Sequence, residues 1–118
     1  MTKPKWEIIY YKTSQGRSPV EAFINSLEAK AKSKIINTLD MLTEFGIKLN
    51  SPHVKKIVST QLWELRILGN DSIRIFYTSL PNMKFLLLNG FQKKTQKINP
   101  KEIKNAASRL LDYKTRQN

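Results

Sequence analysis

The sequence predicts an α+β fold: an N-terminal strand, a helical hairpin, an antiparallel β-meander of three or four strands and a C-terminal helix. Two stretches with helically spaced apolar residues follow a first strand-like segment, alternation of period two dominates from Trp63 onward, and one more helical stripe closes the chain. Because the connections between the alternating segments are too short for crossovers, we expect antiparallel strands with helices over one face of the sheet.

The chain length fits a single domain over residues 1–118, since 118 residues can bury one hydrophobic core but not two. We expect residues 115–118 to form a frayed tail. No apolar run approaches the ~20 residues needed to cross a bilayer. The basic N-terminus leads into a strand rather than a signal sequence, so we expect a cytoplasmic protein with no membrane partner.

The strongest compositional feature is charge: 21 Lys and Arg against 9 Asp and Glu give a net charge of +12. Basic residues occur in both halves of the chain and form no long block, so a folded surface must carry them. Nucleic acid or an acidic protein is the expected partner. With no Cys and one His, thiol chemistry and multi-histidine metal sites are excluded, and we expect no metal and no cofactor.

The first half of the chain reads as a strand followed by two helices. Residues 6–11 are aromatic and β-branched, which favours a strand. Ser18 and Pro19 open a helix, and Gly46 follows the last turn of the second helix as a C-terminal cap. The expected buried faces are Val20, Phe23, Ile24 and Leu27 on the first helix, and Ile35, Leu39 and Leu42 on the second.

The second half reads as strands and a helix. A short strand is expected around residues 54–58, alternating strands follow at 63–68 and 73–78, and the apolar run 85–91 predicts the central, most buried strand. Asn99 and Pro100 begin the last helix. Its apolar stripe consists of Ile103, Ala106, Ala107, Leu110 and Leu111.

The alternation fixes a register between two strands. A three-residue loop, Gly69–Asp71, keeps the apolar residues of both strands on one face and places Arg66 opposite Arg74 on the other. Like charges in that position repel, so a shared anion is expected between them. Two readings remain: a surface salt-bridge cluster with Glu64, or a site where guanidinium groups bind a phosphate.

Other basic residues are expected to converge on this polar face. Lysines leave the buried strand at its end, and two more precede the meander. Phe91 is either a stacking platform for a base or part of the core. His53, the sole imidazole, is either a general acid–base group or an ordinary loop residue. The candidate RNA-binding residues are Lys55, Lys56, Phe91, Lys94 and Lys97.

Several short motifs occur in a characteristic order along the chain: Leu62-Trp63-Glu64-Leu65-Arg66, Arg74-Ile75-Phe76-Tyr77, the stretch 87–97, and Pro100-Lys101-Glu102-Ile103 with Ala106 downstream. Together they resemble the RelE/ParE superfamily of bacterial toxins, and most closely its HigB-like, phage-derived members. The resemblance covers nearly the whole chain.

The resemblance implies a toxin of a type II toxin–antitoxin system. Such a toxin is expected to act as a metal-independent mRNA endoribonuclease, or mRNA interferase, on the ribosome and so to inhibit translation. Its expected partner is an antitoxin with a helix-turn-helix domain, and operator DNA would be contacted only through that complex. By similarity, Arg66, Arg74, Lys93 and Lys94 match basic positions of the RNA-binding or catalytic surface.

Metal-free RNA cleavage needs a base, positive charge on the phosphorane and an acid, and these residues are the candidates for the three roles. Arg66 and Arg74 suit the stabilisation of the developing phosphorane charge. The base that activates the 2′-hydroxyl is Lys93, Lys94 or Glu64, and the candidate acid for the leaving oxygen is His53. Where better-known HigB toxins carry acidic, Tyr and His residues, this chain has Phe91 to Lys94.

Three rival functions share the same sequence features. A ParE-like gyrase inhibitor has the fold without RNase chemistry, and a non-catalytic RNA- or ribosome-binding module has the basic face without cleavage. A protein-interaction domain would use that face only for an acidic partner.

Overall fold

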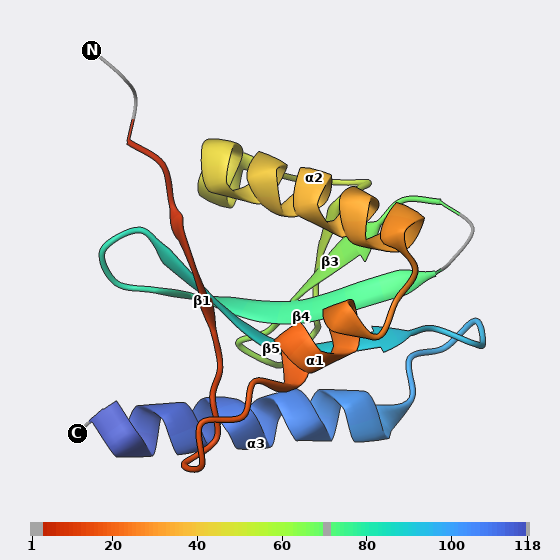
Figure 1. Ribbon diagram of the computed structural model, residues 1–118. Coiled ribbons are helices and arrows are strands. Elements are labelled where there is room, and N and C mark those ends of the chain that lie inside the picture. Colours follow the sequence, from red (N-terminus) through yellow and green to blue (C-terminus); the bar gives the residue numbers. More distant parts are fainter. Residues whose placement is uncertain (1–3, 70–71, 118) are drawn as a thin grey trace.

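The computed structural model describes residues 4–69 and 72–117 and arranges them as a five-stranded sheet between helices (Figure 1). The elements in chain order are β1 (Glu7–Tyr10), α1 (Pro19–Asn25), α2 (Ala29–Phe45), the short 3₁₀ helix η1 (Gly46–Lys48), β2 (Val54–Lys56), β3 (Trp63–Ile67), β4 (Ile73–Leu80), β5 (Lys84–Gln92) and α3 (Pro100–Gln117). The expected α+β class is confirmed.

The strand order is β1-β5-β4-β3-β2. Strands β2 to β5 form an antiparallel meander, and β1 pairs with β5 in parallel. The predicted meander is therefore present in its four-stranded form, with a parallel strand added. Strand β5 is interior and almost wholly buried, as expected, but β4 occupies the middle of the sheet.

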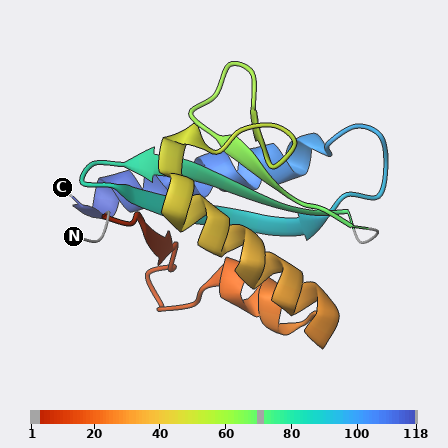
Figure 2. The ribbon, with the colours of Figure 1, turned by 90° about the horizontal axis from the view of Figure 1, so that it is seen from above.

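Helices cover both faces of the sheet, which corrects the expectation of one covered face. Figures 1 and 2 show α1 and α2 on one side and α3 on the other. Leu65, Ile75 and Leu87 pack beneath α2, whereas Phe76 and Leu86 pack beneath α3. The second face thus carries its own apolar cluster, and this cluster needs a cover of its own.

The predicted helical hairpin is present only in part. Ser18 caps α1 by accepting a hydrogen bond from the Glu21 amide (3.3 Å), but α1 has only 7 residues against 17 for α2. Phe23 of α1 lies directly over Gly90 of β5, where a Cβ atom would meet the ring at 2.6 Å. The short first helix therefore packs on the sheet as well as on its neighbour in sequence.

The predicted register between β3 and β4 is confirmed, because Arg66 pairs with Arg74 and Leu65 with Ile75. Two residues of the expected loop, Asn70 and Asp71, lie outside the described residues. Between β4 and β5 a bulge shifts the register after the Phe76–Asn89 pair. The bulge leaves one extra residue on β5, so that the consecutive residues Leu88 and Asn89 both contact the α3 side of the sheet.

Helix α3 begins at the predicted Asn99–Pro100 signature, where the Asn99 side chain accepts a hydrogen bond from the Lys101 amide (3.0 Å). Ala106 and Leu110 are buried as expected, but Leu111 is 68% exposed. The helix continues through Gln117, past the point where fraying is expected to begin, and Asn118 lies outside the described residues. No helix in the described ranges is both long and apolar enough to cross a membrane.

Candidate functional site

Four residues from neighbouring strands lie side by side on the face of the sheet that α3 covers: His53, Arg66, Arg74 and Phe91. We call this set the arginine row. The Arg66 amide donates to the His53 carbonyl (2.8 Å), which extends the β2–β3 ladder by one step and sets His53 opposite Arg66. Arg66 in turn pairs with Arg74, and Arg74 with Phe91. Since neighbouring strands lie about 4.8 Å apart, the first three members span two strand spacings on one face.

Glu64 holds the two arginines of this row. Its side chain is fully buried, Arg66 Nε donates to its Oε1 at 2.9 Å, and Arg74 Nε lies 3.9 Å from its Oε2. The arginine side chains retain 29% and 17% exposure respectively. The expected salt-bridge cluster therefore exists, but it is anchored by a buried carboxylate rather than lying on the surface.

The burial of Glu64 changes its expected role. A carboxylate with no exposed surface, paired to two guanidinium groups, is poorly placed to take a proton from a substrate hydroxyl. It is well placed to fix the orientation of both forks. Arg74 also donates to the Ile73 carbonyl (3.0 Å), and each guanidinium group has further N–H donors beyond these contacts.

Buried polar atoms without hydrogen-bond partners concentrate on this face. Among the described residues they are His53 Nδ1, Glu64 Oε2 and Arg74 Nε. Such an atom costs roughly 1–3 kcal/mol when left unpaired, and native structures keep few of them. Glu64 Oε2 and Arg74 Nε face each other in the ion pair at 3.9 Å, too far apart for a hydrogen bond, and His53 lies on the same face.

A pocket of about 450 Å³ opens beside Arg74. Arg74, Lys93 and Lys94 line it together with Ser72, Thr95 and Gln96. The Lys93 amide donates to the Ser72 carbonyl (2.8 Å), which ties the lysine segment to the start of β4. The structure thus joins Arg74 to the lysines that leave β5, as the sequence predicts.

Of the three other lysines predicted to bind RNA, only one lies on the candidate face. Lys55 pairs with Glu64 across β2 and β3 and is exposed on the candidate face. Lys56 corrects the expectation, because it points to the opposite face, where its Nζ lies 5.1 Å from the Trp63 ring centroid and donates to the Thr60 carbonyl. Lys97 is exposed in the segment before α3 and does not line the pocket at Arg74.

Phe91 also corrects the expectation of a base-stacking platform. Its side chain is only 8% exposed and meets Phe76 edge-on, with ring centroids 5.0 Å apart. Both rings belong to the apolar cluster beneath α3. Phe91 is therefore a core residue at the end of the row, and neither face of its ring is exposed for stacking on a base.

Sequence reasoning missed a polar network that anchors α3 beside the site. Arg109 donates to the Leu88 carbonyl (2.8 Å) and to the Asn89 side chain (3.0 Å), and the Asn89 amide donates to the Glu102 carbonyl (3.2 Å). Burial lowers the pKa of the Arg109 guanidinium. The signal was available, since Asn89 interrupts the apolar run of β5.

A second network ties α3 to the end of β1. The Tyr11 hydroxyl donates to Asp112 (2.6 Å), and Arg116 donates to the same carboxylate (2.8 Å) and to the Lys12 carbonyl. The hydrogen bonds from Arg116 and Tyr11 lower the pKa of Asp112. Burial and the Asp112 partner raise the pKa of Tyr11. These residues stabilise the fold at a distance from the arginine row.

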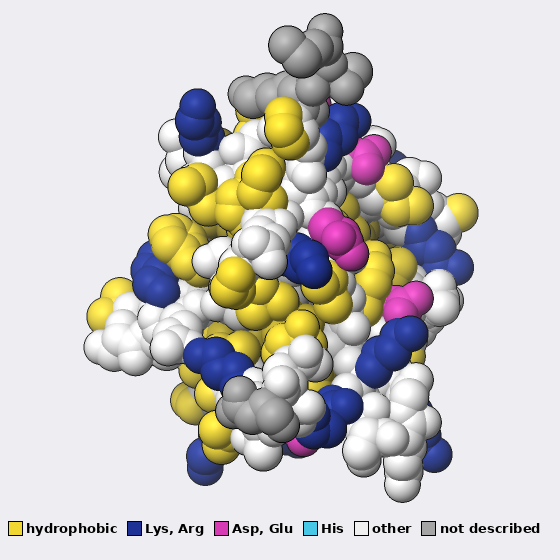
Figure 3. Space-filling model, turned by 90° about the vertical axis from the view of Figure 1, so that its left-hand side faces the viewer, with side chains coloured by type: hydrophobic (Ala, Val, Ile, Leu, Met, Phe, Trp, Pro, Cys, Tyr) yellow, Lys and Arg dark blue, Asp and Glu magenta, His cyan; other side chains and the backbone are white. Residues whose placement is uncertain are grey.

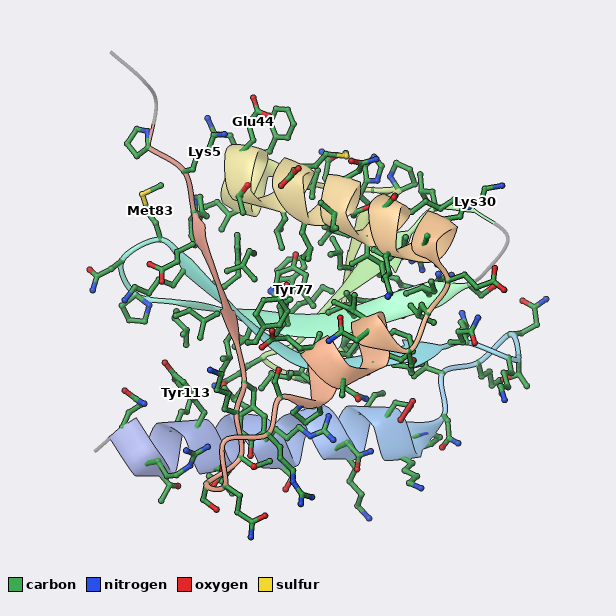
Figure 4. All side chains as sticks on the ribbon, viewed as in Figure 1. Lys5, Lys30, Glu44, Tyr77, Met83 and Tyr113 are labelled. Atoms are coloured by element: carbon green, nitrogen blue, oxygen red, sulfur yellow. The ribbon has the colours of Figure 1, made fainter. Side chains whose placement is uncertain are left out.

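Tyr77 belongs to the core rather than to the site. It lies between the sheet and α2 (Figure 4), and its ring meets Phe85 edge-on at 5.3 Å between centroids. Burial raises its pKa strongly. Across the described ranges, His, Asp and Glu side chains form no group of three or more that would hold a metal ion.

The net charge is not confined to the candidate face. Figure 3 views the side of the molecule away from the start of β4, and Lys and Arg side chains are scattered there among hydrophobic patches. What distinguishes the arginine row is therefore arrangement rather than charge density: two paired guanidinium groups, one buried carboxylate and an adjoining lysine pocket.

One family model matches most of the chain. Residues 22–111 match the family described as phage derived protein Gp49-like (DUF891), a span that runs from α1 to the middle of α3 and includes His53, both arginines and the lysine pocket. No curated protein matches the chain. Membership of the RelE/ParE superfamily stays a prediction. The chain belongs to the phage-derived Gp49-like family, a family of toxin-like proteins.

Proposed function

We propose that this protein is the toxin of a type II toxin–antitoxin pair and inhibits translation by cleaving mRNA without a metal ion, at the arginine row on the ribosome. The observation that carries the proposal is the pair of facing arginines, Arg66 and Arg74, which the buried Glu64 holds on one sheet face beside the lysine-lined pocket. Family membership is consistent with a toxin-like role.

The arginine pair supplies the phosphate-binding part of this mechanism. Glu64 neutralises only one of the two guanidinium charges, and Lys93 and Lys94 add further positive charge beside Arg74. A guanidinium fork fits phosphate oxygens, and fixed donors stabilise the charge that develops on the phosphorane. The buried carboxylate holds the forks in place before substrate arrives, so little reorganisation is needed.

Proton transfer falls to a residue at one end of the row and to a lysine of the adjoining pocket. His53 lies opposite Arg66, and Lys93 lines the pocket beside Arg74. We propose that one of them removes the 2′-hydroxyl proton while the other protonates the departing 5′-oxygen. The attacking oxygen comes from the RNA itself, so the products are a 2′,3′-cyclic phosphate and a 5′-hydroxyl. Glu64 acts on the arginines rather than on the substrate.

The ribosome and an antitoxin complete the proposal. A ribosome that holds mRNA in a fixed path supplies much of the positioning that a small, open site lacks. An antitoxin with a helix-turn-helix domain is the proposed inhibitor, and operator DNA is contacted only through that complex. These partners rest on the resemblance of the sequence motifs to HigB-like toxins.

Inducible expression followed by separate readouts tests the function. Wild-type protein is expected to arrest translation and to give new 5′ ends in primer extension of mRNA, while Arg66→Ala and Arg74→Ala give none. Arg17→Ala is the matched control, because Arg17 is exposed in the loop before α1 and lies outside the arginine row.

The same experiment separates the rival functions. If plasmid DNA loses negative supercoiling while mRNA stays intact, the result would support a gyrase inhibitor instead. Arrested translation with intact mRNA would support a non-catalytic ribosome-binding module. Identical cleavage by wild type and both arginine variants would remove the arginine row from the mechanism.

A further inference from the structure

Strand β1 forms one edge of the sheet and pairs with β5 on its inner side. The amides of Glu7 and Tyr11 donate to carbonyl groups on the β5 side of this pair, at 2.9 Å and 3.0 Å respectively. Since the backbone groups of successive strand residues point in opposite directions within a sheet, the N–H and C=O groups of Ile8 and Tyr10 point away from β5. Within the described part of the chain, no backbone group bonds to them on that outer side.

The two ends of this outer edge are already closed by helices. The Trp6 amide donates to the Thr43 carbonyl near the end of α2 (2.9 Å), and the Lys12 carbonyl accepts a hydrogen bond from Arg116 of α3. The unpaired stretch lies between these two contacts. It presents the short, alternating row of donors and acceptors that an added strand requires.

A groove of about 450 Å³ follows this free edge. Residues of β1 form its floor, and its walls are Glu21 of α1 on one side and Tyr113 and Gln117 of α3 on the other. Figures 1 and 2 both show β1 as the outermost strand, with α1 and α3 on opposite faces of the sheet. All residues that line the groove are exposed or half-buried, so a bound chain has access to the edge.

The helical walls determine which kind of strand fits the edge. A second copy of this chain would have to bring its own β1 to the groove, but that strand is recessed between the same walls. The net charge of +12 on each copy also opposes the pairing. A single extended segment is narrow enough to enter the groove, and it meets an edge that pairs through main-chain hydrogen bonds.

Basic side chains lie at both ends of the groove. Lys12 lines one end. At the other end the groove adjoins a hollow of about 460 Å³, which shares two α3 residues with it and is lined by Lys84 and Lys114. Within the groove itself, Glu7 and Glu21 repel acidic side chains. Acidic residues therefore suit the ends of a bound segment, and uncharged β-forming residues suit its middle.

We propose that the free edge of β1 is a docking site for an extended segment of a second polypeptide, which carries acidic residues at both ends and binds as an additional strand. Ile8 and Tyr10 supply the main-chain hydrogen bonds, and Lys12 and Lys84 meet the carboxylates. The edge lies beside the first half of β5, whereas the lysine pocket of the candidate site follows the end of β5. The inference is thus independent of the proposed cleavage chemistry.

Hydrogen exchange of ¹⁵N-labelled protein tests the edge. The probe is a synthetic peptide, acetyl-Glu-Glu-Val-Thr-Val-Thr-Glu-Glu-amide. The Ile8 and Tyr10 amides are expected to exchange faster than the Ile9 amide in the free protein. At a peptide concentration about ten times the dissociation constant, their exchange should slow about tenfold while that of Ile9 stays unchanged. Absence of protection at Ile8 and Tyr10 up to the solubility limit of the peptide would overturn the proposal.

Charge variants test the acidic ends of the segment. Lys12→Glu is expected to weaken binding of the peptide about fivefold. Lys48→Glu is the matched control, because it makes the same change at an exposed lysine that does not line the groove. A peptide with lysine in place of each glutamate should also bind more weakly. Equal effects of the two variants, or equal affinities of the two peptides, would contradict the assignment of an acidic partner.

Proline substitution tests the main-chain pairing. Ile8→Pro removes only an outward-pointing N–H group, which edge strands tolerate, so the variant should fold and lose peptide binding. Ile9→Pro removes a donor to β5 and should lower the thermal midpoint further. Peptide binding that survives in folded Ile8→Pro would contradict the added strand. Sedimentation of the protein alone tests the other occupant: a dimer that Ile8→Pro dissociates would assign the edge to a second copy and overturn the proposal.

Discussion

Glu64 decides how the arginine row is built. A sheet position that sets Arg66 opposite Arg74 is unfavourable unless an anion lies between them. Glu64 provides that anion from the neighbouring position of β3, at the cost of burying its own carboxylate completely. A buried ion pair contributes little net stability compared with apolar packing, but removal of one partner is strongly destabilising. The cluster is thus better explained by preorganisation of the arginines than by stability.

Double-mutant cycles measure this arrangement. The coupling free energy between Glu64 and Arg66 is expected to lie between about 0.5 and 3 kcal/mol. It should exceed the coupling between Glu64 and Arg74, because the closest N–O distances are 2.9 Å and 3.9 Å. Urea denaturation of variants in which Glu64, Arg66 and Arg74 are replaced by glutamine, singly and in pairs, gives both coupling free energies. Equal coupling free energies, or none, would show that the Glu64 carboxylate does not fix the orientation of the guanidinium groups.

At the level of single residues, the sequence predicts which residues lie opposite one another in the sheet better than it predicts how deeply each side chain is buried. Alternation with a fixed loop length is enough to place Arg66 opposite Arg74 and on the same face as Glu64. It does not say what covers that face, so the burial of Glu64 is not predicted, and Phe91 is left between a core residue and a stacking platform. The predicted convergence of both Lys55 and Lys56 on this face is wrong, because neighbouring residues of a strand point to opposite faces.

Among the elements, α1 depends on one close approach to β5. Gly90 leaves room for the Phe23 ring, and a Cβ atom there would lie 2.6 Å from Phe23 Cδ2. Gly90→Ala is therefore expected to destabilise the fold by about 1–3 kcal/mol through overpacking. Thermal or urea denaturation measures the change.

Phe23→Leu provides the control for this contact. In the Gly90→Ala background it is expected to cost less than in the wild type, since the smaller side chain leaves space for the new methyl group. Additive effects of the two substitutions would mean that α1 does not pack on β5 as the structure shows.

The contact between α3 and β1 predicts a pH dependence of stability. The pKa of Asp112 is lowered by Arg116 and Tyr11, so this carboxylate contributes stability above its unfolded value of about 3.8 and loses it as the pH falls through its lower folded value. The difference in the free energy of unfolding between wild type and Asp112→Asn should thus be full near neutral pH and shrink below about pH 4.

Denaturation of both proteins across that pH range measures the effect. Asp40→Asn, an exposed substitution on α2, controls for the loss of one carboxylate. A wild-type advantage over Asp112→Asn that is unchanged at acid pH would contradict the stabilising role of the Tyr11–Asp112–Arg116 contact.

Helix starts and strand patterns are local, and the sequence predicts them well. The caps at Ser18 and Asn99 lie where their signatures place them. The parallel pairing of β1 with β5 is not predicted, because it joins segments more than seventy residues apart in sequence. The cover of the second face by α3 is likewise a property of the assembled sheet rather than of its own apolar stripe.

On the scale of the whole molecule, the net charge of +12 does not by itself locate a functional site. Basic side chains also occupy surfaces far from the arginine row (Figure 3). General charge accounts for salt-sensitive attraction to any nucleic acid. The proposed reaction additionally requires His53, Arg66 and Arg74 of the row and the buried carboxylate of Glu64.

Metal dependence distinguishes the proposed chemistry from metal-assisted hydrolysis. With Arg66 and Arg74 as the charges that stabilise the phosphorane, cleavage of ribosome-free RNA by purified protein is expected to be slower than on the ribosome but equally fast in EDTA and in Mg²⁺. Ribosome-free RNA is used because EDTA dissociates ribosomes. A rate that falls to background in EDTA and returns with added Mg²⁺ would replace the arginine mechanism.

The central claim, that the RNA supplies its own nucleophile at the arginine row, is tested most directly with one modified substrate. An mRNA that carries a single 2′-deoxy nucleotide at the mapped cleavage position is presented to the purified protein on ribosomes, beside the unmodified mRNA. We expect the unmodified strand to give a 2′,3′-cyclic phosphate and a 5′-hydroxyl, and the deoxy strand to stay intact at that position. Cleavage of both strands to a 5′-phosphate would contradict the account.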